Sequence, residues 1–206
     1  MTLQNRVDPY GRLIATPERG TLMGNRGILH DESKRVVAAW RTKRWIACVL
    51  DFRCRKRQVF TPRKYSELFF LDEATALAAG HRPCAECRRQ RYNEFCAAWV
   101  AGNGGTGRPR ADAMDTVIHA DRFERGGGKK TYEAALSSLP EGAFVERDGR
   151  EHLIRGGLLL PWNFAGYGPA ARDLEPSTTV RVLTPASIVR TIRAGFVPVV
   201  HPSAGA

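Results

Sequence analysis

Residues 68–91 read LFFLDEATALAAGHRPCAECRRQR, and this stretch holds the clearest local signals in the chain. The apolar run Leu68–Leu71 predicts a short buried strand. Asp72 is a good N-cap, and the alanine-rich segment after it favours a short helix. Gly80 stands where a left-handed residue is expected to end that helix. The stretch therefore predicts a strand followed by a helix with a defined start and stop.

Two cysteines follow this helix at the spacing of metal ligands. Pro83 prevents the helix from continuing, and Cys84 and Cys87 come directly after it as a Cys-x-x-Cys pair. Two thiols at this spacing can turn toward one point, which inside a cell is typically occupied by zinc. We therefore expect zinc as a cofactor, held in part by these two residues. The alternative is a pair that packs without metal or does redox chemistry, although no thioredoxin-like βαβ pattern surrounds it.

Basic residues are concentrated in one segment upstream of these cysteines. The chain has 206 residues and a net charge of +11, and between Lys34 and Lys64 eleven lysines and arginines face one acid, Asp51. Such a concentration attracts polyanions, of which nucleic acid is the commonest. We expect nucleic acid, and DNA in particular, as the partner; a solvated basic face without an anionic partner is the alternative. The residues expected to contact phosphate are Arg41, Arg44, Arg53, Arg55, Lys56, Arg57, Arg63 and Lys64.

The basic segment also contains a predicted β-hairpin. Trp45–Phe52 predicts a strand, because it is rich in apolar and β-branched residues, and Val59–Phe60 is expected to return antiparallel to it. Arg53–Arg57 then lies at or near the bend, where guanidinium groups suit bidentate phosphate contacts. The aromatic residues expected to stack on bases are Trp40, Trp45 and Tyr65.

A helix is expected over residues 85–100, because apolar residues recur there every three or four positions, and a second helix is expected over residues 111–123. The loop Gly102–Pro109 between them is a candidate boundary. We expect a basic, zinc-binding region over residues 1–101 and an α+β region over residues 111–206, or one continuous domain.

Three polar residues on the second of these helices are the candidate catalytic groups. Asp115 and His119 are four residues apart and share one face of the helix, and Asp112 precedes them. Two acids and a histidine can bind metal or transfer protons. On a surface helix, however, such residues are usually only solvated.

The last third of the chain predicts further strands. Residues 143–147 and 151–155 alternate apolar and polar side chains, and Asp148-Gly149 between them is a strong hairpin signal. The expected fold class is therefore α+β, with a small zinc-stabilised unit of a hairpin and helices followed by a β-rich C-terminal part.

Composition excludes several other classes. An odd number of cysteines, five, without a secretory signal argues against a disulfide framework. The absence of a run of about 18 apolar residues argues against a membrane span. A cytoplasmic location is the resulting expectation.

Residues 69–87, FFLDEATALAAGHRPCAEC, resemble the zinc-binding domain of the Ada-type methyl-accepting DNA-repair proteins. That family shares the aromatic strand end, the short alanine-rich helix ending in Ala-Gly, and Arg-Pro-Cys-x-x-Cys; His81 stands at its aromatic position. The resemblance implies that four cysteines hold zinc and that one of an upstream pair accepts a methyl group from a DNA phosphate. Cys84 and Cys87 match the downstream pair.

The upstream pair departs from the family pattern. The family places three residues between those cysteines, whereas Cys48 and Cys54 have five between them. On one straight strand, six steps of about 3.3 Å would separate them by about 20 Å, too far to share an ion. Given zinc, Cys48 is expected as the third ligand, and the candidates for the fourth are Cys54, His81, His119 and His30. With only three protein ligands, the fourth position could hold water and the site could be catalytic.

Three functions therefore remain open on the sequence alone. The first is a zinc-binding, DNA-binding protein that acts in repair or regulation. The second is a metal-dependent nuclease or other hydrolase acting on nucleic acid or a phosphorylated substrate. The third is a structural module that binds a partner through its basic face.

Overall fold

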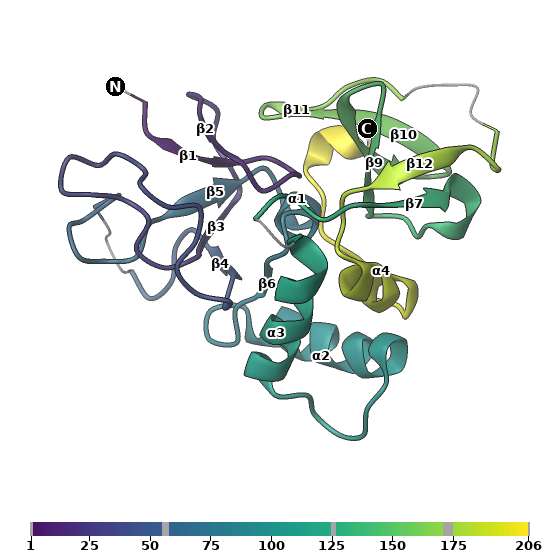
Figure 1. The fold of residues 1–206 in the computed structure, drawn as a ribbon, viewed down its shortest axis with the longest axis horizontal. Helices are drawn as coiled ribbons and strands as arrows, with labels where there is room; N and C mark the ends of the chain where they lie inside the picture. Colours follow the sequence, from purple (N-terminus) through teal and green to yellow (C-terminus); the bar gives the residue numbers. More distant parts are fainter. Residues whose placement is uncertain (1, 55–57, 125–126, 171–174, 206) are drawn as a thin grey trace.

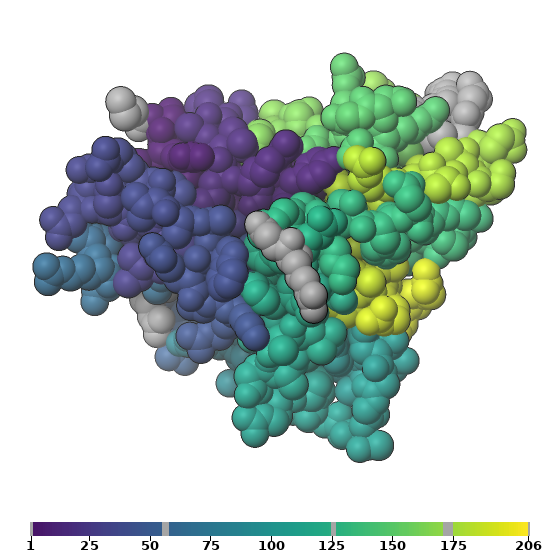
Figure 2. All heavy atoms as spheres, in the orientation of Figure 1, coloured from purple at the N-terminus to yellow at the C-terminus, as the bar shows by residue number. Residues whose placement is uncertain are grey.

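The computed structural model describes residues 2–54, 58–124, 127–170 and 175–205 (Figure 1). These residues form two six-stranded sheets and four α-helices, so the predicted α+β class is confirmed. Figure 2 shows the first, middle and last parts of the chain meeting at the centre of one face. No described helix is both long and apolar enough to cross a membrane.

The first sheet is built from the N-terminal half and mixes parallel and antiparallel pairs. Strand β1 pairs parallel with β5, and β4 pairs parallel with β6, while the other neighbours are antiparallel. In spatial order its strands are β2 (Leu13–Ala15), β1 (Gln4–Val7), β5 (Leu68–Phe70), β3 (Leu22–Asn25), β4 (Ile46–Val49) and β6 (Arg82–Pro83).

The second sheet is antiparallel throughout and is formed by the C-terminal part. In spatial order its strands are β11 (Gly166–Tyr167), β10 (Leu158–Asn163), β9 (Arg150–Arg155), β8 (Phe144–Arg147), β12 (Thr179–Val182) and β7 (Tyr132–Ala135). The predicted two-residue hairpin is present between β8 and β9, where Arg147 pairs with Arg150. Asp148 and Gly149 have φ angles of 52° and 71°, the left-handed pair that this tight turn requires.

The short helix α1 (Glu73–Ala78) lies between the two sheets, and all its residues are buried (Figure 1). Its small side chains permit this position, since Ala74 and Ala78 pack with the second sheet and Ala76 with the first. Asp72 caps it as predicted, because Oδ1 accepts a hydrogen bond from the backbone of Thr75 at 2.8 Å. The other carboxylate oxygen, Oδ2, accepts from Tyr167 Oη at 2.7 Å and from the His201 backbone at 2.8 Å. The cap therefore also binds the C-terminal part to the N-terminal half.

A helical layer covers the junction of the two sheets. It contains α2 (Arg89–Asn103), α3 (Ala111–Arg122) and α4 (Ala186–Arg193), and its core includes residues from both halves of the chain. Cys96 is buried in this core, as its place on the apolar face predicted. Asn103 Nδ2 donates to Ser187 O at 3.1 Å and to Thr191 Oγ1 at 3.0 Å. Packing therefore extends across the boundary expected at Gly102–Pro109.

The predicted hairpin between Trp45–Phe52 and Val59–Phe60 is wrong. Strand β4 pairs with β3 on one side and β6 on the other, so neither of its edges is free for a third strand. Val59 and Phe60 lie in turns outside the strands. Of the predicted bend, Arg53 and Cys54 have left-handed φ angles of 54°, and residues 55–57 lie outside the described residues.

Candidate metal centre and the adjoining sheet face

Three cysteines from two separate segments in the N-terminal half of the chain lie together. Cys48 belongs to β4, Cys84 follows β6, and Cys87 lies in the turn before α2. Their Sγ atoms are all within 4.8 Å of one another. The parallel pairing of β4 with β6 creates this arrangement, because the backbone of Cys84 donates to Ala47 O at 2.9 Å and so lies beside Cys48.

These three residues fit a thiolate metal site. Tetrahedral zinc with Zn–S bonds of about 2.3 Å needs sulfur atoms roughly 3.8 Å apart, so little movement would close the group around an ion. Cys48 and Cys84 are buried, whereas Cys87 is partly exposed. The backbone N–H of Glu86 points at Cys84 Sγ, with an N···S distance of 3.4 Å. The residues described here can therefore hold a metal ion.

The thiols also share negative charge in a way that favours a cation. Hydrogen bonds from Cys48 and Cys87 lower the pKa of the Cys84 thiol to about 2. The hydrogen bonds that Cys48 donates to Cys84 and Cys87 raise the pKa of the Cys48 thiol, and burial raises it further. The group therefore carries one thiolate easily, and a nearby cation is needed before all three can lose their protons.

The expectation that Cys54 completes the ligand set is not met. Its thiol is exposed and lies outside the group of three. Strand β4 ends at Val49, so Cys54 lies beyond the strand that positions Cys48. The upstream half of the site is therefore one cysteine, Cys48.

The three candidate histidines also lie outside this group of thiols, and each is hydrogen-bonded elsewhere. These bonds join His30 Nδ1 to Ser66 Oγ at 2.6 Å, His81 Nε2 to Arg26 Nε at 3.3 Å, and His119 Nδ1 to Arg122 Nη2 at 3.0 Å. Burial lowers the pKa of His81 and His119, and nearby arginines lower it further. Within the described part of the chain, the set of protein ligands therefore ends at three cysteines.

The candidate catalytic residues of α3 do not converge. Asp115 is 5% exposed, and both its oxygens accept from Arg82, at 2.8 Å each. Asp112 is exposed and pairs with Arg110. His119 packs edge-on against Trp40, with ring centroids 4.7 Å apart. A metal or acid–base site formed by these residues is therefore not supported by their positions.

A row of cross-strand neighbours connects the cysteines to the far side of the first sheet. Arg6 on β1 pairs with Phe69 on β5, Phe69 with Met23 on β3, and Met23 with Cys48. Directly opposed residues on neighbouring strands project to the same face of a sheet. The face that begins at Arg6 therefore ends at the candidate metal centre.

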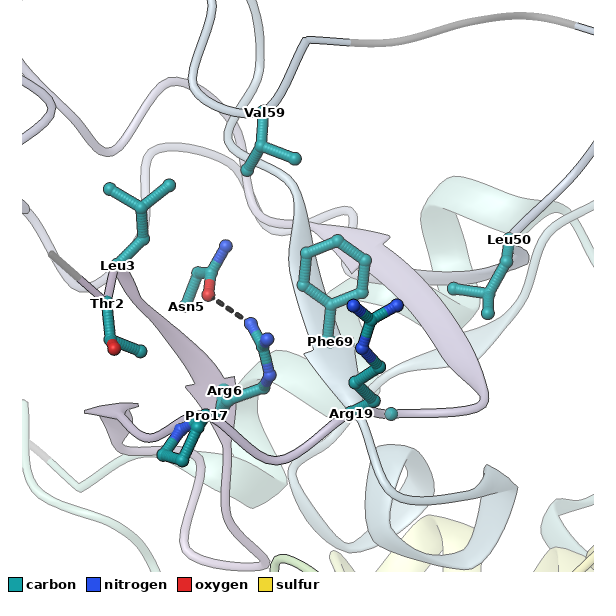
Figure 3. Close-up of a pocket in the computed structure, with 10 residues that line it drawn as sticks. Thr2, Leu3, Asn5, Arg6, Pro17, Arg19, Leu50, Val59 and Phe69 are labelled. Atoms are coloured by element: carbon teal, nitrogen blue, oxygen red, sulfur yellow. Dashed lines mark hydrogen bonds between the residues drawn. The ribbon is translucent and has the colours of Figure 1, made fainter.

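A pocket of about 400 Å³ opens at the Arg6 end of this face (Figure 3). Figure 3 shows Arg6, Arg19 and Phe69 lying beside one another, and Leu50 and Val59 also line the pocket. The guanidinium carbon of Arg6 is 4.9 Å from the centroid of the Phe69 ring. Burial and the neighbouring charge of Arg19 lower the pKa of Arg6. Two close guanidinium groups and a partly exposed ring suit a phosphate and a base.

The predicted phosphate-contact residues are exposed wherever they are described. They are Arg41, Arg44, Arg53, Arg63 and Lys64, whereas Arg55, Lys56 and Arg57 fall outside the described residues. The predicted base-stacking role does not fit Trp45, which is 2% exposed, and Trp40 packs on α3. No short-range pattern marks Arg6, Arg19 or Phe69, because strand pairing between distant segments brings them together.

No protein-family model matches this sequence, and no curated protein and no solved structure matches the chain. Function is therefore inferred from the three thiols, the pocket at Arg6 and Arg19, and the exposed basic residues.

Proposed function

We propose that the chain binds zinc through Cys48, Cys84 and Cys87 and binds nucleic acid, DNA in particular, across the adjoining sheet face. The observation that carries this proposal is the group of three thiols within 4.8 Å at one end of the row that starts at Arg6. Thiolate ligands select zinc and other soft metals. The resemblance of residues 69–87 to the Ada-type zinc-binding domain supports the same assignment and makes DNA repair or regulation the proposed process.

Zinc at this site would fix the junction between two strands and a helix. It would tie β4 to the turn that leads into α2. A ligand bound at the fourth coordination position of the zinc would be polarised by the metal. The cysteines are free thiols in the structure. A reducing, cytoplasmic location, which we propose, keeps such thiols available to metal.

Nucleic acid would contact the face through charge and stacking. Arg19 is exposed, and no described carboxylate pairs with it, so its charge is available to a phosphate. Phe69 is partly exposed beside Arg6 and offers a ring on which a base can stack. The exposed basic residues between Lys34 and Lys64 add sequence-independent phosphate contacts.

Binding of a fluorescently labelled 20-nucleotide DNA, single- and double-stranded, tests this proposal by anisotropy in a salt titration. We expect the double variant Arg6→Gln/Arg19→Gln to bind at least tenfold more weakly at 50 mM salt. Loss of two phosphate contacts should also reduce the slope of log K against log salt for the duplex by about 1.8. The matched control is Arg147→Gln/Arg150→Gln, which removes two charges from the β8–β9 turn.

The control should bind DNA as the unmodified protein does. Equal affinity of the Arg6→Gln/Arg19→Gln protein and the unmodified protein, or binding that does not weaken from 50 to 200 mM salt, would contradict the proposed interface.

A second candidate is a metal-dependent enzyme that acts on nucleic acid at the thiol site itself. It is favoured by the described ligand set, which ends at three cysteines and so resembles metal sites that keep one position for substrate. Zinc-loaded protein that cleaves a labelled strand, with no cleavage by the Cys84→Ser variant, would select this candidate over simple binding.

A further inference from the structure

A second pocket lies on a different part of the molecule and has a volume of about 330 Å³. Its walls come from the turn at Gly11, from Trp45, from the C-terminal end of α3, and from Lys129, which follows α3 in the chain. It shares no lining residue with the pocket at Arg6, and none of the three thiols lines it. It is therefore separate from the site already described.

Three cations line this pocket without a carboxylate partner among the described residues. They are Arg26 and Arg122, each 1% exposed, and the partly buried Lys129. Asp8 is the acid whose charge acts on Arg26 and Lys129. Its two oxygens are already held by Arg12, at 2.9 Å from the backbone nitrogen and 2.6 Å from Nε.

Two buried nitrogen atoms of these arginines lack a hydrogen-bond partner in the described structure, Arg26 Nη2 and Arg122 Nε. A buried charged donor without a partner is costly, and native proteins rarely retain one without a ligand or a functional reason. Arg26 Nη2 lies beside the pocket wall. A Cβ atom at Gly11, a residue of that wall, would be 3.5 Å from it.

Both guanidinium groups are held rigidly. Their Cζ atoms lie 3.9 Å and 3.7 Å from the Trp45 ring centroid for Arg26 and Arg122, respectively. Arg26 Nη1 donates to Gly11 O and Arg122 Nη1 to Gly80 O, each at 2.7 Å. Donors fixed in this way lose little freedom when an anion binds.

Gly80 makes room for one of these arginines. Its φ angle is +89°, as the helix end requires, and a Cβ atom there would lie only 2.6 Å from Cδ of Arg122. Gly80 therefore serves two purposes, because it ends α1 and admits a buried cation beside it.

The pKa values of Arg26, Arg122 and Lys129 are all lowered, because these cations are buried or partly buried and no described carboxylate neutralises them. Burial lowers the pKa of Arg26 to about 9. Burial, with repulsion from Arg26, lowers the pKa of Arg122 to about 8 and that of Lys129 to about 7. An anion in the pocket would reverse these shifts, since a nearby negative charge favours the protonated forms.

We propose that this pocket binds a phosphate group, carried by a small phosphate ester or by the 5′ end of a nucleic-acid strand. Guanidinium and ammonium groups, three of which line this pocket, are the donors that bind phosphate oxygens. The walls also include Trp45, Phe123 and Tyr10, and the volume exceeds that of inorganic phosphate, so an organic part of the ligand has space. The inference does not depend on the thiol site or on the sheet face at Arg6.

Thermal unfolding and calorimetry at pH 7, with inorganic phosphate against chloride of equal ionic strength, test the proposal on the full chain. Saturating phosphate is expected to raise the unfolding temperature by about 5 °C. Lys129→Met should weaken phosphate binding at least tenfold and, without phosphate, should raise the unfolding temperature, because it removes a partly buried charge that no described carboxylate neutralises. The matched control is Lys130→Met. The Lys130 ammonium group does not line the pocket, so this substitution should change neither phosphate binding nor the unfolding temperature.

A second variant keeps the buried cations intact. Ala39 is exposed at the pocket wall, and Ala39→Glu would place a carboxylate at its entrance and weaken phosphate binding at least tenfold. A phosphate-induced shift that persists in both Lys129→Met and Ala39→Glu, or an equal shift with chloride, would overturn the proposal.

A 5′-phosphorylated strand that binds tighter than both free phosphate and the 5′-hydroxyl strand would identify the strand end as the ligand that carries the phosphate. Equal binding by the 5′-phosphorylated and 5′-hydroxyl strands would identify a small phosphate ester as the ligand of this pocket.

Discussion

Replacing Asp115 by asparagine is expected to lower the free energy of unfolding by roughly 3–5 kcal/mol. Both carboxylate oxygens of Asp115 bind Arg82, one at Nε and one at Nη2, and the two side chains are 6% and 3% exposed. Asparagine is nearly the same size but leaves the Arg82 charge buried without a counter-charge. Because Arg82 belongs to β6, directly before Pro83 and Cys84, the ion pair also fixes the strand that positions the thiols.

Urea unfolding at pH 7 measures this effect, and Asp112 provides a matched control on the same helix. Asp112 pairs with Arg110 at the surface, where both side chains are mostly exposed, so Asp112→Asn should change stability far less than Asp115→Asn does. If the two variants lose similar stability, Asp115 does not have the structural role assigned to it.

Replacing Cys84 by serine is expected to weaken zinc binding more than 100-fold. Loss of an outer-shell partner typically costs 10–100-fold in metal affinity, and Cys84 is itself a proposed ligand. It is also the thiol whose pKa is lowest, because it accepts hydrogen bonds from both Cys48 and Cys87. Since zinc affinity contributes directly to folding, the zinc-loaded protein should lose most of its metal-dependent thermal stability.

Competition with a chromophoric chelator measures this affinity, and Cys54→Ser is the control. Cys54 is exposed and outside the group of three, so its replacement should leave zinc affinity and unfolding temperature unchanged. A loss of zinc in Cys54→Ser comparable to that in Cys84→Ser would show that a fourth cysteine joins the site.

Local signals in the sequence predicted the elements that depend on neighbouring residues. Asp72, the alanines and Gly80 specify α1, and Asp148-Gly149 specifies the β8–β9 turn. Strand pairing between distant segments has no such signature. The antiparallel partner expected for Trp45–Phe52 was therefore wrong, because the edges of β4 are taken by β3 and β6.

The candidate site divides in the same way. The spacing of Cys84 and Cys87 predicts two ligands, whereas the contribution of Cys48 without Cys54 depends on the β4–β6 pairing. Arg26 and Arg122 gave no signal, since a buried arginine and a surface arginine look alike in sequence. Their burial follows from packing against Trp45, which brings segments far apart in the chain together.

X-ray absorption at the zinc edge of the purified, metal-loaded protein tests the proposed metal centre most directly. Three thiolates from Cys48, Cys84 and Cys87 predict about one zinc per chain, with three sulfur atoms at about 2.3 Å and one lighter oxygen or nitrogen ligand. Four sulfur ligands, or a protein that retains no zinc, would contradict the three-cysteine centre.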